Sequence, residues 1–281
     1  MMGALAWVAA GLAAAANVLG RFLLIPVGMV PGWLSATAIA AMTGVLLLAV
    51  FKYTSNQRAI HRVRNQIDAN LLALKLFKDS ARVALRSQGR ILDGAGRLFV
   101  LAVVPMLVMT LPAALILGQL ALWYEARPLR VGEESVITLG LGGDARAPWP
   151  AVSLEPTDAL EVAAGPVRVR SRREVCWNVE ARKPGLHHLA FKVGDRTVTK
   201  ELAIGDGFMR VSAERPDWDV LSILENPAEA PFRPGDPVRS IAIAYPERPS
   251  KTSGTGWWVI YWFVVSFATA FCFRGALGVK M

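Results

Sequence analysis

Charged residues are scarce in this sequence, and cysteine and histidine are rarer still. Only 19% of the 281 residues are charged and 53% are hydrophobic, whereas soluble domains carry about 25% charged residues. Hydrophobicity at this level also excludes a disordered chain. The two cysteines, Cys176 and Cys272, and the three histidines form no CxxC pair or histidine-rich cluster. We therefore expect neither a metal site nor a cofactor.

Catalytic motifs are missing as well. The sequence has no GxSxG, HExxH, GxGxxG or phosphate-binding loop, which are the patterns that place nucleophiles, metals and nucleotides. The pair His187-His188 falls in a predicted strand, where neighbouring side chains point to opposite faces. Solvent exposure is therefore favoured over metal binding. We expect no catalytic residues and no enzymatic activity.

The apolar residues form blocks long enough for membrane helices. A helix needs about 20 apolar residues to cross the hydrocarbon core, and four blocks reach or approach this length: residues 3–20, 33–51, 98–123 and 256–273. The pattern predicts a multi-pass membrane protein with three to four spans. For the first block three alternatives stay open: a span, a helix in the membrane interface and a cleaved signal peptide. The signal peptide is disfavoured, because no Lys or Arg precedes the block, and of the other two the interfacial helix is slightly favoured.

The positive charge is concentrated in one segment. Residues 52–97 hold ten Lys/Arg and three Asp, whereas residues 124–255 hold 18 basic and 19 acidic side chains. Short basic loops stay in the cytoplasm, and long neutral domains are translocated. We expect the first segment and the C-terminus to be cytoplasmic, and the second to lie outside. The two cysteines then lie in different compartments and form no disulfide.

The basic segment has the periodicity of two amphipathic helices. Apolar residues recur every three or four positions at Ile60, Val63, Ile67, Leu71 and Leu74, and again at Ala84, Ile91, Ala95 and Leu98. Asp79 or Ser80 can cap the second helix, and the first is expected to continue the helix of 33–51 without a break. This predicts an antiparallel, coiled-coil-like hairpin, with a single long bent helix as the alternative. Its basic face comprises Arg58, Arg62, Arg64, Lys75, Lys78, Arg82, Arg86 and Arg90. Such a face favours anionic lipid headgroups over nucleic acid.

Residues 128–248 change to a strand pattern. Six short runs are rich in β-branched and aromatic residues and are separated by turn signals: VITLGL, VRVRS, VCWNVEA, HHLAFKV, TVTKELAI and SIAIAY. They predict an antiparallel, immunoglobulin-like β-sandwich with Trp177 in its core. Residues 214–240 hold five prolines and are expected to form a long surface loop.

The predicted fold is thus a membrane helical core with a cytoplasmic helical hairpin and an inserted extracytoplasmic β-sandwich. We expect six segments, with the following boundaries: an N-terminal interfacial or spanning helix at 1–31, a transmembrane helix at 32–54, the hairpin at 55–95, a second transmembrane helix at 96–124, the sandwich at 125–252, and a third transmembrane helix with a cytoplasmic tail at 253–281.

Two stretches resemble the YidC/Oxa membrane-insertase superfamily. They are KYTSNQRAIHRVRNQIDANLLAL, which begins at Lys52, and VVPMLVMTLPAALILGQLALWYEARP, which begins at Val103. The order of span, basic hairpin and span over residues 1–127 is similar to the minimal three-span members. A group of bacterial membrane proteins with the KYTSNQ junction and the closing FRGALGVKM is similar too. The insertase resemblance implies a groove that lowers the cost of moving polar segments of nascent membrane proteins into lipid.

The chain departs from that family in three respects, one of which is that a single span follows the β domain, where YidC has more. The family carries an arginine in its first core span, where this sequence has Met42-Thr43. The β domain lies between the second and third core spans, whereas the large domain of YidC precedes the core. The candidate groove residues are Arg21, Thr43, Met106, Met109, Thr110 and Gln119. For Arg21, and for nearby Asn17, an ionisable or polar group at depth indicates function, but snorkelling of Arg21 to the headgroups is favoured.

Two functions follow as hypotheses. In the first, the protein is an insertion or assembly chaperone whose partners are anionic lipids and nascent membrane proteins. In the second, it is a structural or recognition subunit of an envelope complex, and the β domain binds an external protein partner.

Overall fold

The computed structural model describes residues 2–76, 81–143, 148–248 and 257–279. The chain divides into two compact units. One, the sheet unit, comprises Met1–Ala36 and Ala114–Tyr261. The other, the helical unit, comprises Thr37–Ala113 and Trp262–Met281. Asp79, Ser80 and Lys78 lie outside the described residues, so the proposed helix cap and one hairpin cation have no structural account.

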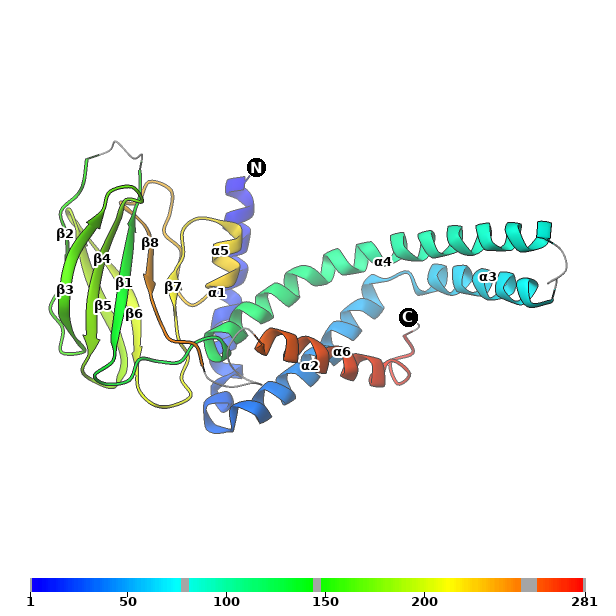
Figure 1. Ribbon diagram of the computed structural model, residues 1–281, viewed down its shortest axis with the longest axis horizontal. Helices are drawn as coiled ribbons and strands as arrows, with labels where there is room; N and C mark the ends of the chain where they lie inside the picture. Colours follow the sequence, from blue (N-terminus) through cyan, green and yellow to red (C-terminus); the bar gives the residue numbers. More distant parts are fainter. Residues whose placement is uncertain (1, 77–80, 144–147, 249–256, 280–281) are drawn as a thin grey trace. The chain divides into compact units, whose positions relative to one another are not determined.

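Helices account for both apolar ends of the chain (Figure 1). Their bounds are α1 Met2–Leu23, the 3-10 helix η1 Ile25–Met29, α2 Gly32–Thr54, α3 Gln57–Leu76, α4 Ala81–Tyr124, α5 Val220–Glu225 and α6 Trp258–Phe273. Three of the helices in the described part of the chain are long and apolar enough to cross a membrane, at Gly3–Leu23, Gly32–Thr54 and Arg82–Tyr124. The predicted last span is a shorter apolar helix of 16 residues, about 24 Å long at 1.5 Å per residue. Length and composition therefore mark the chain as a membrane protein.

The helix of the first confident span does not continue into the hairpin, and that prediction is wrong. The break falls at Ser55-Asn56, between α2 and α3. Asn56 Oδ1 accepts a hydrogen bond from the Ala59 backbone N–H at 3.0 Å, which satisfies one of the free donors at the start of α3. The Asn side chain therefore ends one helix and begins the next.

The hairpin helices α3 and α4 pack through a glycine. Gly94 is buried, and a Cβ at this position would lie 2.7 Å from Cγ1 of Ile67. Ala95, which was expected on the packed face, is exposed. The predicted residues Ala84, Ile91 and Leu98 are partly buried, and Gly94 replaces Ala95 on the packed face because the small glycine allows the closest approach. From the hairpin onward α4 has no break, and the whole helix, Ala81–Tyr124, has 44 residues and contains Pro105 and Pro112.

The strands form two sheets in which all pairs of named strands are antiparallel. One sheet has the order β3-β4-β1-β8-β7 and the other has the order β2-β5-β6 (Figure 1). The bounds are β1 Glu134–Leu141, β2 Val152–Leu154, β3 Leu160–Val169, β4 Glu174–Ala181, β5 Gly185–Val193, β6 Arg196–Ile204, β7 Glu214–Arg215 and β8 Val238–Ile243. The six predicted strands are confirmed, and the short strands β2 and β7 were not predicted.

One hydrophobic core joins the two sheets. Trp177 on β4 is 2% exposed, and its ring centroid lies 5.5 Å from that of Phe191 on β5. Ile137 and Leu139 of β1 belong to the same cluster and are fully buried. The alternating burial of β4 matches the period-two pattern of its sequence. The prediction of Trp177 as a core residue is confirmed.

The segment 214–240 is not simply a surface loop, and that prediction is wrong. It contains α5, whose N-cap Asp219 accepts hydrogen bonds from the backbone N–H groups of Leu221 and Ser222. Ile223 of α5 is 1% exposed and packs against α1. The side chains of α1 in this cluster are Ala6, Ala9 and Ala13. Small residues at helical spacing let the two helices approach closely.

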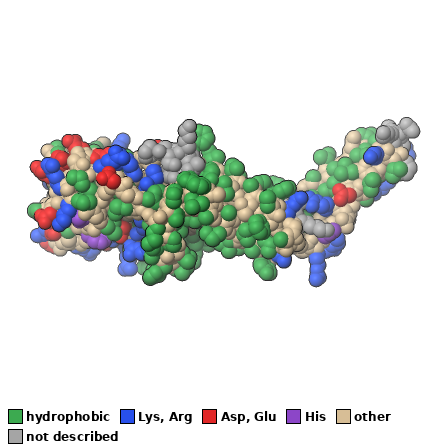
Figure 2. Space-filling view, turned by 90° about the horizontal axis from the view of Figure 1, so that it is seen from below, with side chains coloured by type: hydrophobic (Ala, Val, Ile, Leu, Met, Phe, Trp, Pro, Cys, Tyr) green, Lys and Arg blue, Asp and Glu red, His purple; other side chains and the backbone are tan. Residues whose placement is uncertain are grey.

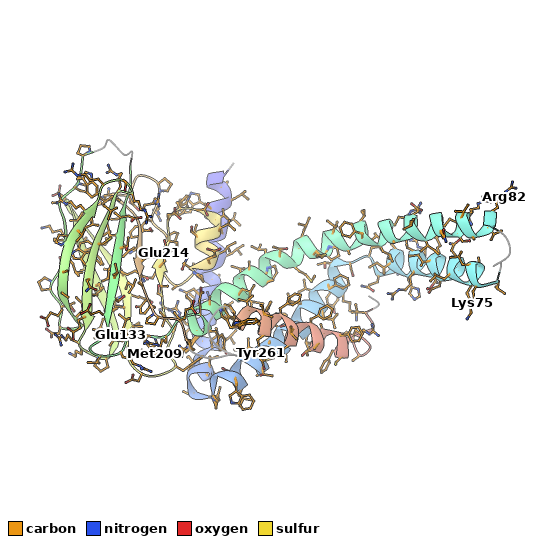
Figure 3. All side chains as sticks on the ribbon, viewed as in Figure 1. Lys75, Arg82, Glu133, Met209, Glu214 and Tyr261 are labelled. Carbon is orange, nitrogen blue, oxygen red and sulfur yellow. The ribbon has the colours of Figure 1, made fainter. Side chains whose placement is uncertain are left out.

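A hydrogen-bonded ion pair between Arg127 and Glu133, called the clamp below, fixes the connection from α4 to β1. Arg127 donates two hydrogen bonds to the Glu133 carboxylate, at 2.8 and 2.7 Å. Glu133 lies just before β1 (Figure 3) and also accepts from the Arg130 backbone N–H. The Arg127 hydrogen bonds are the main reason that the pKa of Glu133 falls from 4.5 to about 2. The carboxylate is thus held in its charged form.

Replacement of this carboxylate should remove a pH-dependent contribution to stability. A lowered pKa in the folded state stabilises fully above pH 4.5, and this contribution is lost as the pH falls towards 2. We expect Glu133→Gln to lower the free energy of unfolding by about 1–2 kcal/mol at pH 7, with the difference vanishing near pH 2. Denaturant unfolding of the full chain in detergent at several pH values measures it. The exposed Glu155→Gln is the control, and an equal loss in both variants at pH 7 would contradict the clamp.

Candidate functional site

The helical unit contains an apolar cavity of about 290 Å³. Residues of α2, α4 and α6 line it: Gly44, Leu47, Leu48, Phe51, Met109, Phe263, Ser266, Phe267 and Ala270. Phe263 and Phe267 stack one turn apart with ring centroids 6.2 Å apart. The cavity can therefore hold an apolar group and offers almost no polar contact.

Close packing of α2 and α6 forms one side of this cavity. A Cβ at Gly44 would clash with the backbone of Ser266, so glycine is required for the approach. The Ser266 hydroxyl donates a 2.8 Å hydrogen bond to the Ala40 carbonyl. It is therefore already used in holding the helices together.

The four candidate groove residues in the helical unit do not all reach the cavity. Met109 lines it. Thr43 is buried, and its hydroxyl donates to the Ile39 carbonyl of its own helix at 2.8 Å. Met106 is 58% exposed, and Thr110 is exposed and donates to the Met106 carbonyl at 2.9 Å. The hydroxyl of each threonine thus donates to a backbone carbonyl of its own helix, and neither hydroxyl proton is free for another partner.

The basic residues of the hairpin that the structure describes are all exposed. They are Arg58, Arg62, Arg64 and Lys75 on α3 and Arg82, Arg86 and Arg90 on α4. Lys75 and Arg82 lie at the end of the hairpin (Figure 3). Within the described part of the hairpin, the one ion pair joins Arg97 to Asp93 on α4 at 3.0 Å. Unpaired cations on an exposed arm can bind an anionic surface, and Figure 2 shows blue side chains along this arm.

The other two candidates, Arg21 and Gln119, belong to the sheet unit. Gln119 on α4 is 7% exposed and lies against Gly20 of α1. Arg21 Nη2 lies 3.2 Å from Glu201 Oε1 on β6. The arginine at the end of α1 is therefore paired with the β domain.

Asn17, one turn before Arg21, joins the same polar cluster. Its Oδ1 accepts a 2.6 Å hydrogen bond from Arg210 Nη2, and its amide donates to the Ala228 carbonyl at 3.0 Å. Arg210 also lies 3.6 Å from Glu201. Burial lowers the pKa of Arg210, and Glu201 opposes this shift. Two residues of α1 thus contact charged side chains of the β domain: Arg21 pairs with Glu201, and Asn17 accepts from Arg210.

The cluster continues into a fully buried lysine. Lys200 Nζ lies 2.6 Å from Glu229 Oε1 and donates to the Ser212 hydroxyl at 3.0 Å. Ser212 in turn donates to Glu229 at 2.6 Å, and the Glu201 backbone N–H donates to the second Glu229 oxygen at 3.1 Å. Burial lowers the pKa of Lys200, and the charge of Glu229 opposes this shift. The lysine is saturated by hydrogen bonds and leaves no accessible amine for chemistry.

These network residues were missed by the sequence reasoning, apart from Asn17 and Arg21. A lysine within the TVTKELAI run is a weak signal, because its burial depends on partners far away in the chain. Among the described residues, no group of three or more His, Cys, Asp or Glu could hold a metal ion.

Comparisons of this chain with protein-family models, with curated proteins and with solved structures find no match.

Proposed function

We propose that the protein is an insertion or assembly chaperone for membrane proteins, with the architecture of a divergent three-span YidC/Oxa insertase. In this proposal it lies in a bacterial inner membrane, the hairpin of α3 and α4 is cytoplasmic, and the β domain is an immunoglobulin-like sandwich outside. The apolar cavity among α2, α4 and α6 is the observation that carries the proposal.

The cavity suits one or two apolar side chains of a client helix. Its volume of about 290 Å³ is at the low end of ligand pockets, so it cannot enclose a helix. Three aromatic side chains and Met109 provide adaptable apolar contact. A client segment that docks here would exchange water for these contacts before it moves into lipid, which lowers the cost of each apolar step.

The exposed cations of the hairpin would hold the arm on the membrane surface. Each basic residue near anionic headgroups contributes about 1 kcal/mol. An arm held in this way lies where a nascent chain meets the bilayer. In this proposal the hairpin first binds the nascent chain at the membrane surface, and the cavity then provides apolar contacts for its side chains.

Photocrosslinking in cells tests the cavity. A photoreactive residue at Met109 should crosslink a heterogeneous set of nascent membrane proteins, because this side chain lines the cavity. The same probe at Met106, which is 58% exposed, is the matched control and should give mainly lipid adducts. Lipid adducts alone at both positions would contradict the proposal.

The contribution of the arm is tested by removing its charge or the arm itself. The variant Arg58→Gln/Arg62→Gln/Arg64→Gln should reduce client crosslinks from Met109 about a hundredfold, because it removes about 3 kcal/mol of headgroup attraction. Deletion of residues 58–90 should abolish the crosslinks while the protein stays inserted. Neutralisation of three exposed arginines of the β domain, Arg168, Arg170 and Arg172, is the control and should change nothing. Crosslinks that survive both hairpin variants would show that the hairpin plays no part.

The alternative is a recognition subunit of an envelope complex. The edge strand β3 favours it, because Val162 and Val167 on this strand are 44% and 57% exposed. Exposed edge strands can pair with a partner strand. One recurrent stoichiometric partner in the same crosslinking experiment would support this function instead.

A further inference from the structure

The apolar helix α1 is bound along its length by the β domain. At its N-terminal end Trp7 packs edge-on against Trp218, with ring centroids 4.8 Å apart. In its middle, Ala9 and Ala13 pack against Ile223 of α5. At its C-terminal end Arg21 pairs with Glu201. The helix α1 is apolar enough to cross a membrane, but the side chains that it contacts belong to a domain with charged residues.

Charged groups contact both ends of α1. The Arg233 guanidinium lies 5.2 Å from the Trp7 ring centroid, and Arg210 and Glu201 lie at the other end, beside Asn17 and Arg21. From residue 7 to residue 21 the helix rises about 21 Å, most of the 30 Å hydrocarbon core. A crossing α1 would draw at least one of these charges deep into lipid, at about 2.5–3.5 kcal/mol each. The contacts thus oppose a transmembrane position.

The face of α1 turned away from the domain is apolar and exposed. Val8, Leu19 and Phe22 are 59%, 61% and 72% exposed. A helix that is covered by a polar domain on one face and apolar on the other is suited to the membrane interface. The chain continues at Gly32 into the apolar helix α2, so a candidate membrane span follows α1 closely in the sequence.

A groove of about 440 Å³ runs between α1 and the segment 227–233. Its floor includes Ala10, Gly11 and Ala14 of α1, and its walls include Pro227 and Pro231. A Cβ at Gly11 would meet no atom within 4 Å, so the groove is open there. At its rim Arg233 is exposed and forms no ion pair with any residue that the structure describes.

We propose that α1 lies in the headgroup region of the leaflet on the side of the β domain, and that the groove seats a phospholipid whose phosphate contacts Arg233. An acyl chain then lies over the small side chains around Gly11, and the guanidinium supplies the charge-assisted hydrogen bonds that phosphate takes. The stacking of Arg233 on Trp7 holds the guanidinium at the rim. This site is independent of the proposed chaperone function.

Depth measurements test the position of α1. Spin labels at Val8 and Leu19, in the background Cys176→Ser/Cys272→Ser, lie three turns apart on one face of the helix. In vesicles of phosphatidylglycerol and phosphatidylethanolamine, electron paramagnetic resonance accessibility should give equal depths. Labels at Leu34 and Leu46 of α2 are the control and should differ by about 18 Å. A difference of about 16 Å between the α1 labels would mean that α1 crosses, and the proposal would be wrong.

Native mass spectrometry of the full chain with phosphatidylglycerol tests the groove. Gly11→Phe should fill it and reduce the bound lipid about tenfold, the equivalent of 1.4 kcal/mol. Gly3→Phe is the matched control, because it has equal space and lies outside the groove. Arg233→Ala should reduce binding similarly, whereas Arg172→Ala, also exposed, should not. No retained lipid in the wild type, or equal binding by the two phenylalanine variants, would overturn the proposal.

Discussion

Glu229→Gln is expected to be among the most destabilising single substitutions in the β domain. It would leave the ammonium of Lys200, which is fully buried, without its carboxylate partner at 2.6 Å. Removal of one member of a buried ion pair costs about 3–5 kcal/mol. Denaturant unfolding of the full chain in detergent measures this loss. Glu229 also accepts a hydrogen bond from the backbone N–H of Glu201, the residue that pairs with Arg21 of α1. Limited proteolysis should therefore cut the segment between α1 and α2 sooner in the variant.

The pH dependence and a double variant separate charge from packing. Burial lowers the pKa of Lys200, so the unfolded state binds more protons, and the variant should gain stability as the pH rises towards 10.5. Lys200→Met/Glu229→Gln removes the charge and should recover most of the loss. The control Glu161→Gln breaks an exposed pair with Arg182 and should cost less than about 1 kcal/mol. A double variant no more stable than the single one would refute the charge explanation.

Gly44→Ala should lower both the stability of the helical unit and client capture. Its new Cβ would meet the backbone of Ser266, which cannot rotate away as a side chain can. Displacement of packed groups of this kind costs about 1–3 kcal/mol. Because Gly44 and Ser266 both line the cavity, crosslinks from Met109 should fall in parallel. Thermal unfolding in detergent and the crosslinking yield measure the two effects.

The same substitution elsewhere in the unit should have the opposite sign. A Cβ at Gly89 on α4 would meet nothing within 4 Å. Alanine stabilises a helix over glycine by about 1 kcal/mol, so Gly89→Ala should raise the unfolding temperature. If both variants shifted it in the same direction, the close approach at Gly44 would not be the cause.

The β domain could be predicted in part because burial follows local sequence. In β4 the alternation from Val175 to Ala181 gives both the strand and its buried face, including Trp177. In contrast, α5 was missed because the prolines around it dominate the local pattern. Its six residues are helical through the Asp219 cap and the packing of Ile223 on α1. Neither cause can be found without knowing which distant segment lies beside it.

The candidate site was harder to predict for the same reason. Met109 was named as a candidate groove residue from its own stretch of sequence, which is local information. The pair of Arg21 and Glu201 joins residues 180 positions apart, and no spacing rule reaches that far. Gly44 was not among the candidate groove residues, and its role depends on the Ser266 backbone of another helix. Such contacts depend on which distant segments the fold brings together, and the periodicity of a single helix does not predict them.

The two prolines of α4 give the apolar region of this helix two backbone hydrogen-bond acceptors. Pro105 and Pro112 lack the N–H groups that would bond to the carbonyls of Leu101 and Val108. These oxygens are seven residues apart, about two helical turns, and so lie on one face. A pair of backbone acceptors on one face can bind water or the hydroxyl of a passing segment. In a span without a buried arginine, the peptide backbone itself can thus offer hydrogen bonds within the hydrocarbon.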